Sequence, residues 1–104
     1  MRVIYYLQEH VETNLTLKDL AEYFKYSESH FSTLFQKETG TFPINYFTRL
    51  KIQKACQYIE LTDMKLNEIA MRLGFEEQAY FSRVFTKVMG ISPSSYRKKE
   101  ADNR

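Results

Sequence analysis

The part of the chain that decides the fold lies in its second half, where residues 66–97 read LNEIAMRLGFEEQAYFSRVFTKVMGISPSSYR. Apolar residues recur there three and four positions apart, first over residues 66–73 and then over residues 81–85. This spacing puts the apolar side chains on one face of a helix. Because a short gap separates the two runs and Gly90 follows the second, the stretch predicts a short helix, a turn, a longer helix and a glycine stop.

The first half of the chain repeats this pattern over residues 17–46. The offset between the copies is 49 residues before the turn and 50 after it, so the second copy carries one extra residue in its turn. Two helices joined by such a short turn, with a small residue where they cross, are typical of a helix-turn-helix, and each copy predicts one. The matched pairs include Leu17 with Leu66, Leu20 with Ile69, Ala21 with Ala70, Phe31 with Phe81, Phe35 with Phe85, and Gly40 with Gly90.

Capping residues indicate where these helices begin and end. Thr16, with Asp19 three residues later, is typical of a helix N-terminus, and Ser27 is placed to cap the longer helix of the first copy. We expect a weaker cap in the second copy, because Lys65 stands where Thr16 stood. Gly40 can supply the left-handed residue that ends a helix.

Three segments organise the chain around the repeat. Residues 1–42 are predicted to hold an N-terminal helix and the first helix-turn-helix, and residues 43–61 to form a long linker helix opened by Pro43. Residues 62–104 are predicted to hold the second helix-turn-helix, a short helix opened by Ser92 and Pro93, and a frayed tail from Lys98 onward. The expected fold is therefore all-α, with two helix-turn-helix subdomains, a long central helix and about seven helices overall.

Composition excludes several classes of protein. No stretch approaches the roughly 18 apolar residues of a membrane span, and the first 15 residues do not resemble a signal peptide, so we expect a cytoplasmic protein without membrane association. A single cysteine, Cys56, and two histidines predict neither a disulfide framework nor a metal site, and no cofactor is expected. No nucleophile with a nearby base and no glycine-rich phosphate loop can be found, which argues against an enzyme.

The polar face of each longer helix is the candidate surface for contacts with DNA bases. With the apolar stripes facing inward, the opposite faces carry hydrogen-bonding groups suited to base edges and few carboxylates. Arg83 is the best candidate for direct readout, since a guanidinium can bond to guanine O6 and N7 together. We predict base contacts by Ser29, His30, Ser32, Thr33, Gln36, Gln78, Ala79, Ser82 and Arg83, and phosphate contacts by Lys37, Thr86, Lys87, Arg49 and Lys51.

Two other interpretations compete with DNA reading. Any surface helix shows polar residues opposite its apolar stripe, although two repeated units with the same outer face make that explanation weaker. The chain could instead be a helical protein-interaction module, whose interface would use its eight Tyr and eight Phe. The net charge of +2 does not decide the matter, because no segment is a basic arm.

A characteristic set of residues extends over both halves of the chain: 69–70, 73–75, 80–85 and 90–97, with 49–52, Ala55, Ser27, Phe35 and Gly40. On these residues, the chain from about Val3 to Arg97 resembles the DNA-binding domain of the AraC/XylS family of bacterial transcription regulators. The resemblance implies a seven-helix domain whose helices at residues 27–39 and 77–89 enter adjacent major-groove segments of double-stranded DNA. It also implies activation through contact with RNA polymerase. Members of the family usually carry a separate sensing or dimerisation domain, so the resemblance implies that this chain is either an excised DNA-binding domain or a short stand-alone regulator.

Three positions depart from the family's pattern. Lys25 stands where a turn glycine is usual, Ala79 where the second unit often has serine, and Phe42 where serine precedes Pro43. Of these, Lys25 has the clearest consequence, because it predicts a strained or reshaped first turn.

Overall fold

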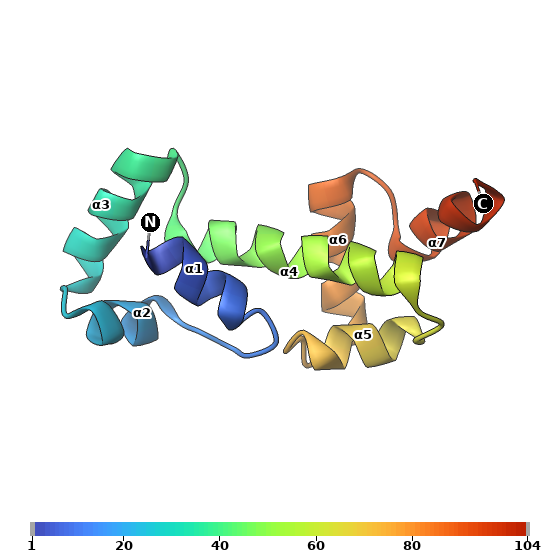
Figure 1. Cartoon of the computed structure of the whole chain (residues 1–104), viewed down its shortest axis with the longest axis horizontal. Coiled ribbons are helices and arrows are strands. Elements are labelled where there is room, and N and C mark those ends of the chain that lie inside the picture. The colour runs from blue at the N-terminus through green and yellow to red at the C-terminus, as the bar shows by residue number, and fades with distance from the viewer. Residues whose placement is uncertain (1, 104) are drawn as a thin grey trace. The chain divides into compact units, whose positions relative to one another are not determined.

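The computed structural model describes residues 2–103, which form helices and no strand (Figure 1). The all-α prediction is therefore confirmed. The described chain divides into two compact units, which we call unit 1 (Met1–Leu50) and unit 2 (Lys51–Arg104). The helices are α1 (Arg2–Glu9), α2 (Leu17–Phe24), α3 (Glu28–Thr39), α4 (Pro43–Leu61), α5 (Leu66–Arg72), α6 (Gln78–Met89) and α7 (Pro93–Asp102).

Unit 1 is built around one core shared by four helices. Leu7 of α1, Leu20 of α2 and Phe47 of α4 are all buried, and they pack with apolar side chains of α3. Half-buried side chains on α1, α2 and α4 surround the core. Because α1 and the first part of α4 both pack against the pair α2–α3, the first helix-turn-helix is stabilised by helices that are not part of it.

Unit 2 is built in the same way. The second part of α4 precedes the second helix-turn-helix in the sequence, as α1 precedes the first. Ile52, Ala55 and Ile59 of α4 pack against Ile69 and its neighbours on α5 and against the inner face of α6. Figure 1 shows α6 standing steeply across α5, as expected for a helix-turn-helix. Cys56 lies in this core, and its burial raises the pKa of the thiol.

The predicted helix caps are confirmed. The backbone N–H of Asp19 donates to the Thr16 hydroxyl oxygen at 3.1 Å, and the N–H of Thr16 donates back to the Asp19 carboxylate at 2.9 Å. This second bond holds the pKa of the Asp19 carboxyl below its usual value. At α5 only half of this arrangement remains, because Lys65 has no side-chain acceptor and only its N–H bonds to Glu68, at 3.3 Å. Ser27 caps α3 by accepting from His30 N–H at 3.2 Å.

The central helix α4 has the bounds predicted for the linker, but it is shared between the units rather than separate from them. Pro43–Leu50 belongs to unit 1, where Phe47 is buried, and the residues from Lys51 onward belong to unit 2. The predicted boundaries at residues 42 and 62 follow the ends of the helix, whereas the cores divide it near its middle. Periodicity reports where a helix lies and not which core it joins.

The prediction of a frayed tail from Lys98 is wrong, because α7 continues to Asp102. Ser92 caps this helix by accepting from Ser95 N–H at 3.1 Å. The Tyr96 hydroxyl donates to the Glu60 carboxylate at 2.7 Å, which ties α7 to α4 within unit 2. Burial and this bond both raise the pKa of the Tyr96 phenol. A helix anchored at its start can extend through the following residues, because they include no proline or glycine. The last residue of the predicted tail, Arg104, lies outside the described residues.

No helix within residues 2–103 is long and apolar enough to cross a membrane.

Candidate nucleic-acid interface

The longer helices of the repeat, α3 and α6, bury the same aromatic pair on their inner faces. Phe31 and Phe35 are buried in unit 1, with ring centroids 6.2 Å apart, and Phe81 and Phe85 are buried in unit 2, 5.8 Å apart. Since the members of each pair are four residues apart, they occupy one helix face and the opposite face turns to solvent. The aromatic pairs therefore determine which residues α3 and α6 can present outward.

The outer face of α3 carries polar side chains that a ligand can reach. The ring of Tyr26, which precedes the helix, meets the His30 ring edge-on with centroids 5.2 Å apart, and this contact restrains the imidazole. Lys37 is exposed in the last turn of the helix. The predicted base contacts on this helix are accessible: Ser29, His30, Thr33 and Gln36 are exposed, and Ser32 is half-buried.

The outer face of α6 is arranged similarly and adds a guanidinium. The Arg83 guanidinium lies 5.8 Å from the centroid of the Tyr80 ring, one helical turn earlier, which is within the range of a cation–π contact. The Thr86 hydroxyl donates to the Ser82 carbonyl oxygen at 2.7 Å and still lies on an exposed residue. Of the predicted contacts on this helix, Gln78, Ala79, Arg83, Thr86 and Lys87 are exposed, and Ser82 is half-buried.

The two turns that position these helices differ as the sequence predicts. Lys25, which ends α2, has φ 62 and is the one non-glycine residue with positive φ in the part of the chain that the structure describes. Its counterpart in unit 2 is Gly74, with φ 85. Three residues, 25–27, lead from this position to α3, whereas four residues, 74–77, lead to α6, so the extra residue of the second copy lies here. The strained first turn predicted from Lys25 is therefore confirmed.

One predicted phosphate contact is wrong. Arg49 and Lys51 lie two residues apart on α4, and the structure separates their roles, because Arg49 is exposed while Lys51 is only 6% exposed. The Lys51 Nζ donates to the backbone carbonyl of Leu73. Lys51 shares a helix face with Ala55, four residues later, and that face enters the core of unit 2. An ammonium enclosed in this way is not presented to a phosphate at the surface.

Tyr80 is a candidate interface residue that is not among the predicted DNA contacts. It is 52% exposed, and its ring packs against Phe75 with centroids 5.9 Å apart while Arg83 lies over it. Because the Tyr80 ring is restrained by Phe75 of the turn, it can in turn restrain the Arg83 guanidinium that lies over it. The signal that points to it is the spacing of three residues between an aromatic residue and an arginine on one helix.

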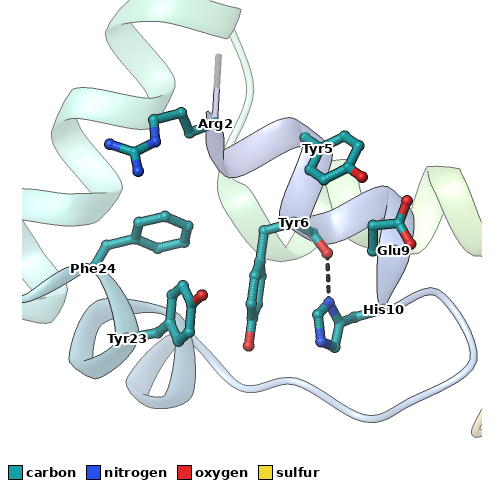
Figure 2. Close-up of a pocket in the computed structure, with 7 residues that line it drawn as sticks. All are labelled: Arg2, Tyr5, Tyr6, Glu9, His10, Tyr23 and Phe24. Atoms are coloured by element: carbon teal, nitrogen blue, oxygen red, sulfur yellow. Dashed lines mark hydrogen bonds between the residues drawn. The ribbon is translucent and has the colours of Figure 1, made fainter.

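Apart from these faces, unit 1 has a shallow aromatic pocket of about 670 Å³ between α1 and α2 (Figure 2). The Tyr6 ring is its centre, with the His10 ring 4.0 Å and the Tyr23 ring 4.2 Å away between centroids. His10 Nδ1 donates to the Tyr6 carbonyl oxygen at 2.7 Å. The contact between Tyr6 and Tyr23 joins α1 to α2, while His10 restrains the Tyr6 ring from the end of α1. The residues that line the pocket are Arg2, Tyr5, Tyr6, Glu9, His10, Tyr23 and Phe24, none of them on α3.

The helix-turn-helix domain family matches residues 20–99 and therefore includes both repeated units. The chain belongs to this family, in its AraC-type branch of DNA-binding domains from transcription regulators.

Curated relatives resemble this chain over a part of their length. The MmsAB operon regulatory protein of Pseudomonas aeruginosa is 39% identical over 94 residues, which are 90% of this chain and 31% of that protein. The HTH-type transcriptional activator Btr of Bacillus subtilis is 38% identical over 95 residues, which are 91% of this chain and 18% of that protein. The chain thus spans about a third or less of the length of these two relatives.

Solved structures share the fold closely. The C-terminal domain of AraT, a response regulator from Geobacillus stearothermophilus, has a TM-score of 0.90 and 35% identity, over 94% of this chain and 82% of that one. The DNA-binding domain of the global transcriptional factor AdpA, solved in complex with a target DNA, has a TM-score of 0.94 and 25% identity, over 99% of this chain and 93% of that one. The family resemblance seen in the sequence is confirmed.

Proposed function

We propose that this chain is the sequence-specific DNA reader of a bacterial transcription regulator, with α3 and α6 entering adjacent major-groove segments. The observation that carries the proposal is the repeated arrangement of these helices, each with a buried aromatic pair on one face and accessible hydrogen-bonding side chains on the other. An α-helix fits the major groove, where each base pair presents its own pattern of donors and acceptors. A related domain of the same fold was solved with target DNA.

Side chains on the two helices divide into base-reading and phosphate-binding groups. Arg83 is proposed to read guanine, and Gln36 and Gln78 to read adenine, because their paired polar atoms match those base edges. Lys37 and Lys87 hold equivalent places near the helix ends, where a cation suits a phosphate and sets the register. Ser29, His30, Ser32, Thr33, Ala79 and Ser82 complete the proposed base contacts, and Thr86 and Arg49 the phosphate contacts.

The two units are proposed to contribute unequally to the electrostatic attraction for DNA. Unit 1 has five Lys or Arg against six Asp or Glu, whereas unit 2 has ten against seven. Cations that neutralise phosphates release counterions and supply most of the affinity that does not depend on sequence. Unit 2 is therefore expected to provide most of the non-specific affinity, while unit 1 adds mainly base contacts.

The protein that contains this domain is proposed to activate transcription through contact with RNA polymerase, working at the nucleoid in the cytoplasm. One relative, Btr, is named a transcriptional activator. A separate sensing or dimerisation domain is proposed to supply the regulatory signal. In vitro transcription from a promoter carrying the selected site would test activation, since a repressor would lower the transcript yield instead.

Selection of binding sites from randomised duplex DNA, with the intact chain, tests the proposed function directly. A specific consensus should emerge, and affinity for it should fall steeply as salt rises, because counterions are released on binding. A protein-interaction module that uses apolar contacts would yield no consensus and little dependence on salt.

Substitutions on α6 test the proposed roles. Arg83→Ala should relax the preference at one base pair by about 1–3 kcal/mol, while Lys87→Ala should weaken binding to all sequences alike and lower the salt slope by about one. Lys18→Ala removes an exposed cation of α2 outside the proposed contacts and should leave affinity nearly unchanged. Identical effects of Arg83→Ala and Lys87→Ala across the randomised pool would contradict the assignment.

A further inference from the structure

Lys51 is the one charged side chain that is buried in the part of the chain the structure describes. It lies on α4 beside Ile52, which is fully buried, and its Nζ donates to the carbonyl oxygen of Leu73, 22 residues later in the chain. Burying an ammonium costs free energy unless it is compensated by polar partners. The Leu73 carbonyl supplies one such partner.

The Leu73 carbonyl occupies a decisive place in the second helix-turn-helix. Leu73 ends α5, and the last carbonyls of a helix lack partners within that helix. Gly74 then turns the chain with φ 85, and the N–H of Phe75 returns to the Ala70 carbonyl at 2.9 Å. An ammonium also suits the negative end of the α5 dipole. Lys51 therefore joins α4 to the turn from which α6 departs.

This turn determines how α6 is presented. Only residues 74–77 separate Leu73 from α6, and Phe75 among them is buried against Phe81 with ring centroids 5.3 Å apart. A shift of the Leu73 carbonyl is carried by this short segment to the first turn of α6. That first turn begins at Gln78, and Arg83 follows about one and a half turns later.

We propose that Lys51 is a positioning residue for DNA recognition, which holds the turn of the second helix-turn-helix so that α6 presents its side chains to base edges in the required register. The proposal rests on the proposed reading of DNA by α6. Bidentate contacts tolerate little displacement, because both hydrogen bonds depend on the alignment of a planar group with the base edge. Loss of the Lys51 contact should therefore reduce discrimination between bases more than it reduces attraction to DNA.

Lys51→Met tests this role, because methionine keeps an unbranched apolar chain and removes the ammonium. With the intact chain, we would measure affinity for the selected site, for sites altered at single base pairs, and for each of these at several salt concentrations. The base pairs read by α6 are those at which Arg83→Ala loses preference, and those read by α3 are those at which Gln36→Ala loses it. Thermal unfolding of each variant shows that binding is measured on folded protein.

The expected result has three parts. Lys51→Met loses about tenfold or more of the discrimination at the α6 base pairs, keeps the discrimination at the α3 base pairs, and has an unchanged salt slope. Lys51→Arg restores much of the loss, since a guanidinium can donate to the same carbonyl. If Lys51→Met does not fold, Lys51→Leu, which also lacks a donor, is judged by the same criteria.

Three results would overturn some part of this picture, and they can be told apart. A lower melting temperature with full discrimination would make Lys51 merely structural. A salt slope lowered by about one with unchanged discrimination would make it a phosphate contact after all. If Arg83→Ala itself leaves discrimination unchanged, the reading of DNA by α6 fails, whatever Lys51 does.

Discussion

Lys25 shows at the scale of one residue how the two repeats depart from each other. Its backbone adopts the left-handed conformation that Gly74 adopts in unit 2. In that conformation the Cβ atom of an ordinary residue approaches its own carbonyl oxygen, which costs about 1–2 kcal/mol. The N–H of Tyr26, which follows, donates to the Ala21 carbonyl at 2.9 Å, and the same bond links Phe75 to Ala70. The first turn thus has the same backbone hydrogen bond as the second, although a lysine replaces glycine at its left-handed position.

Lys25→Gly should therefore stabilise the protein. Removing the Cβ relieves the strain, while the greater freedom of glycine in the unfolded chain offsets part of the gain, so we expect the free energy of unfolding to rise by about 0.5–1 kcal/mol. Urea denaturation followed by circular dichroism measures the change. Lys25→Ala is the matched control, because it removes the long side chain but keeps the Cβ, and it should give no comparable gain. Equal gains would locate the cause in the lysine side chain.

Among the helices, α1 shows how an element outside the helix-turn-helix supports it. It joins the core of unit 1 through Leu7 and contacts α2 through the Tyr6 ring, which lies between His10 and Tyr23 (Figure 2). Its neighbour Tyr5 lines the same pocket but is 65% exposed. Tyr6 therefore packs α1 against α2, whereas Tyr5 contributes mainly to the exposed surface of the pocket.

Tyr6→Ala should destabilise the protein by about 1–3 kcal/mol, because the ring contacts of Tyr6 with Tyr23 and Phe24 of α2 are lost. Tyr5→Ala should change the free energy of unfolding by no more than about 0.5 kcal/mol, since most of its side chain is already in water. Urea denaturation of both variants gives the comparison. A loss for Tyr5→Ala as large as that for Tyr6→Ala would contradict the packing described for α1.

At the scale of the whole molecule, the chain has two cores that share one helix. Leu20 and Ile69 occupy matched positions in the repeat, both are fully buried, and each packs in the core of its own unit. The second part of α4 joins the core that contains Ile69, and the first part joins the core that contains Leu20. A cavity in one core therefore removes contacts from one unit first.

Leu20→Ala and Ile69→Ala should each destabilise the affected unit by about 2–5 kcal/mol, as large-to-small changes in a core do. Hydrogen exchange measured by mass spectrometry would locate the effect. We expect Leu20→Ala to lower the protection of α2 and α3 while α6 keeps its protection, and Ile69→Ala to show the reverse, because protection follows local contacts. An even loss over all helices in both variants would mean that the cores unfold together.

Much of this molecule was determined by local sequence. The repeat, the helix positions, the caps at Thr16 and Ser27 and the polar faces of α3 and α6 could be predicted, because they depend on residues within one or two helical turns of each other. The extra residue in the second turn followed from aligning the repeat with itself, and the strain at Lys25 followed from its departure from the family's pattern. The assignment of the individual DNA contacts remains a prediction.

Tertiary structure alone decided the role of Lys51, the division of α4 between two cores and the extension of α7. Lys51 and Arg49 carry the same charge and lie only two residues apart, and the helical spacing that puts Lys51 on the face of Ala55 does not show which group its ammonium meets. The carbonyl that Lys51 meets comes from Leu73, at the end of another helix, and Tyr96 meets Glu60 from 36 residues away. Such partners are brought together only by packing, so the sequence pattern around each residue carries no record of them.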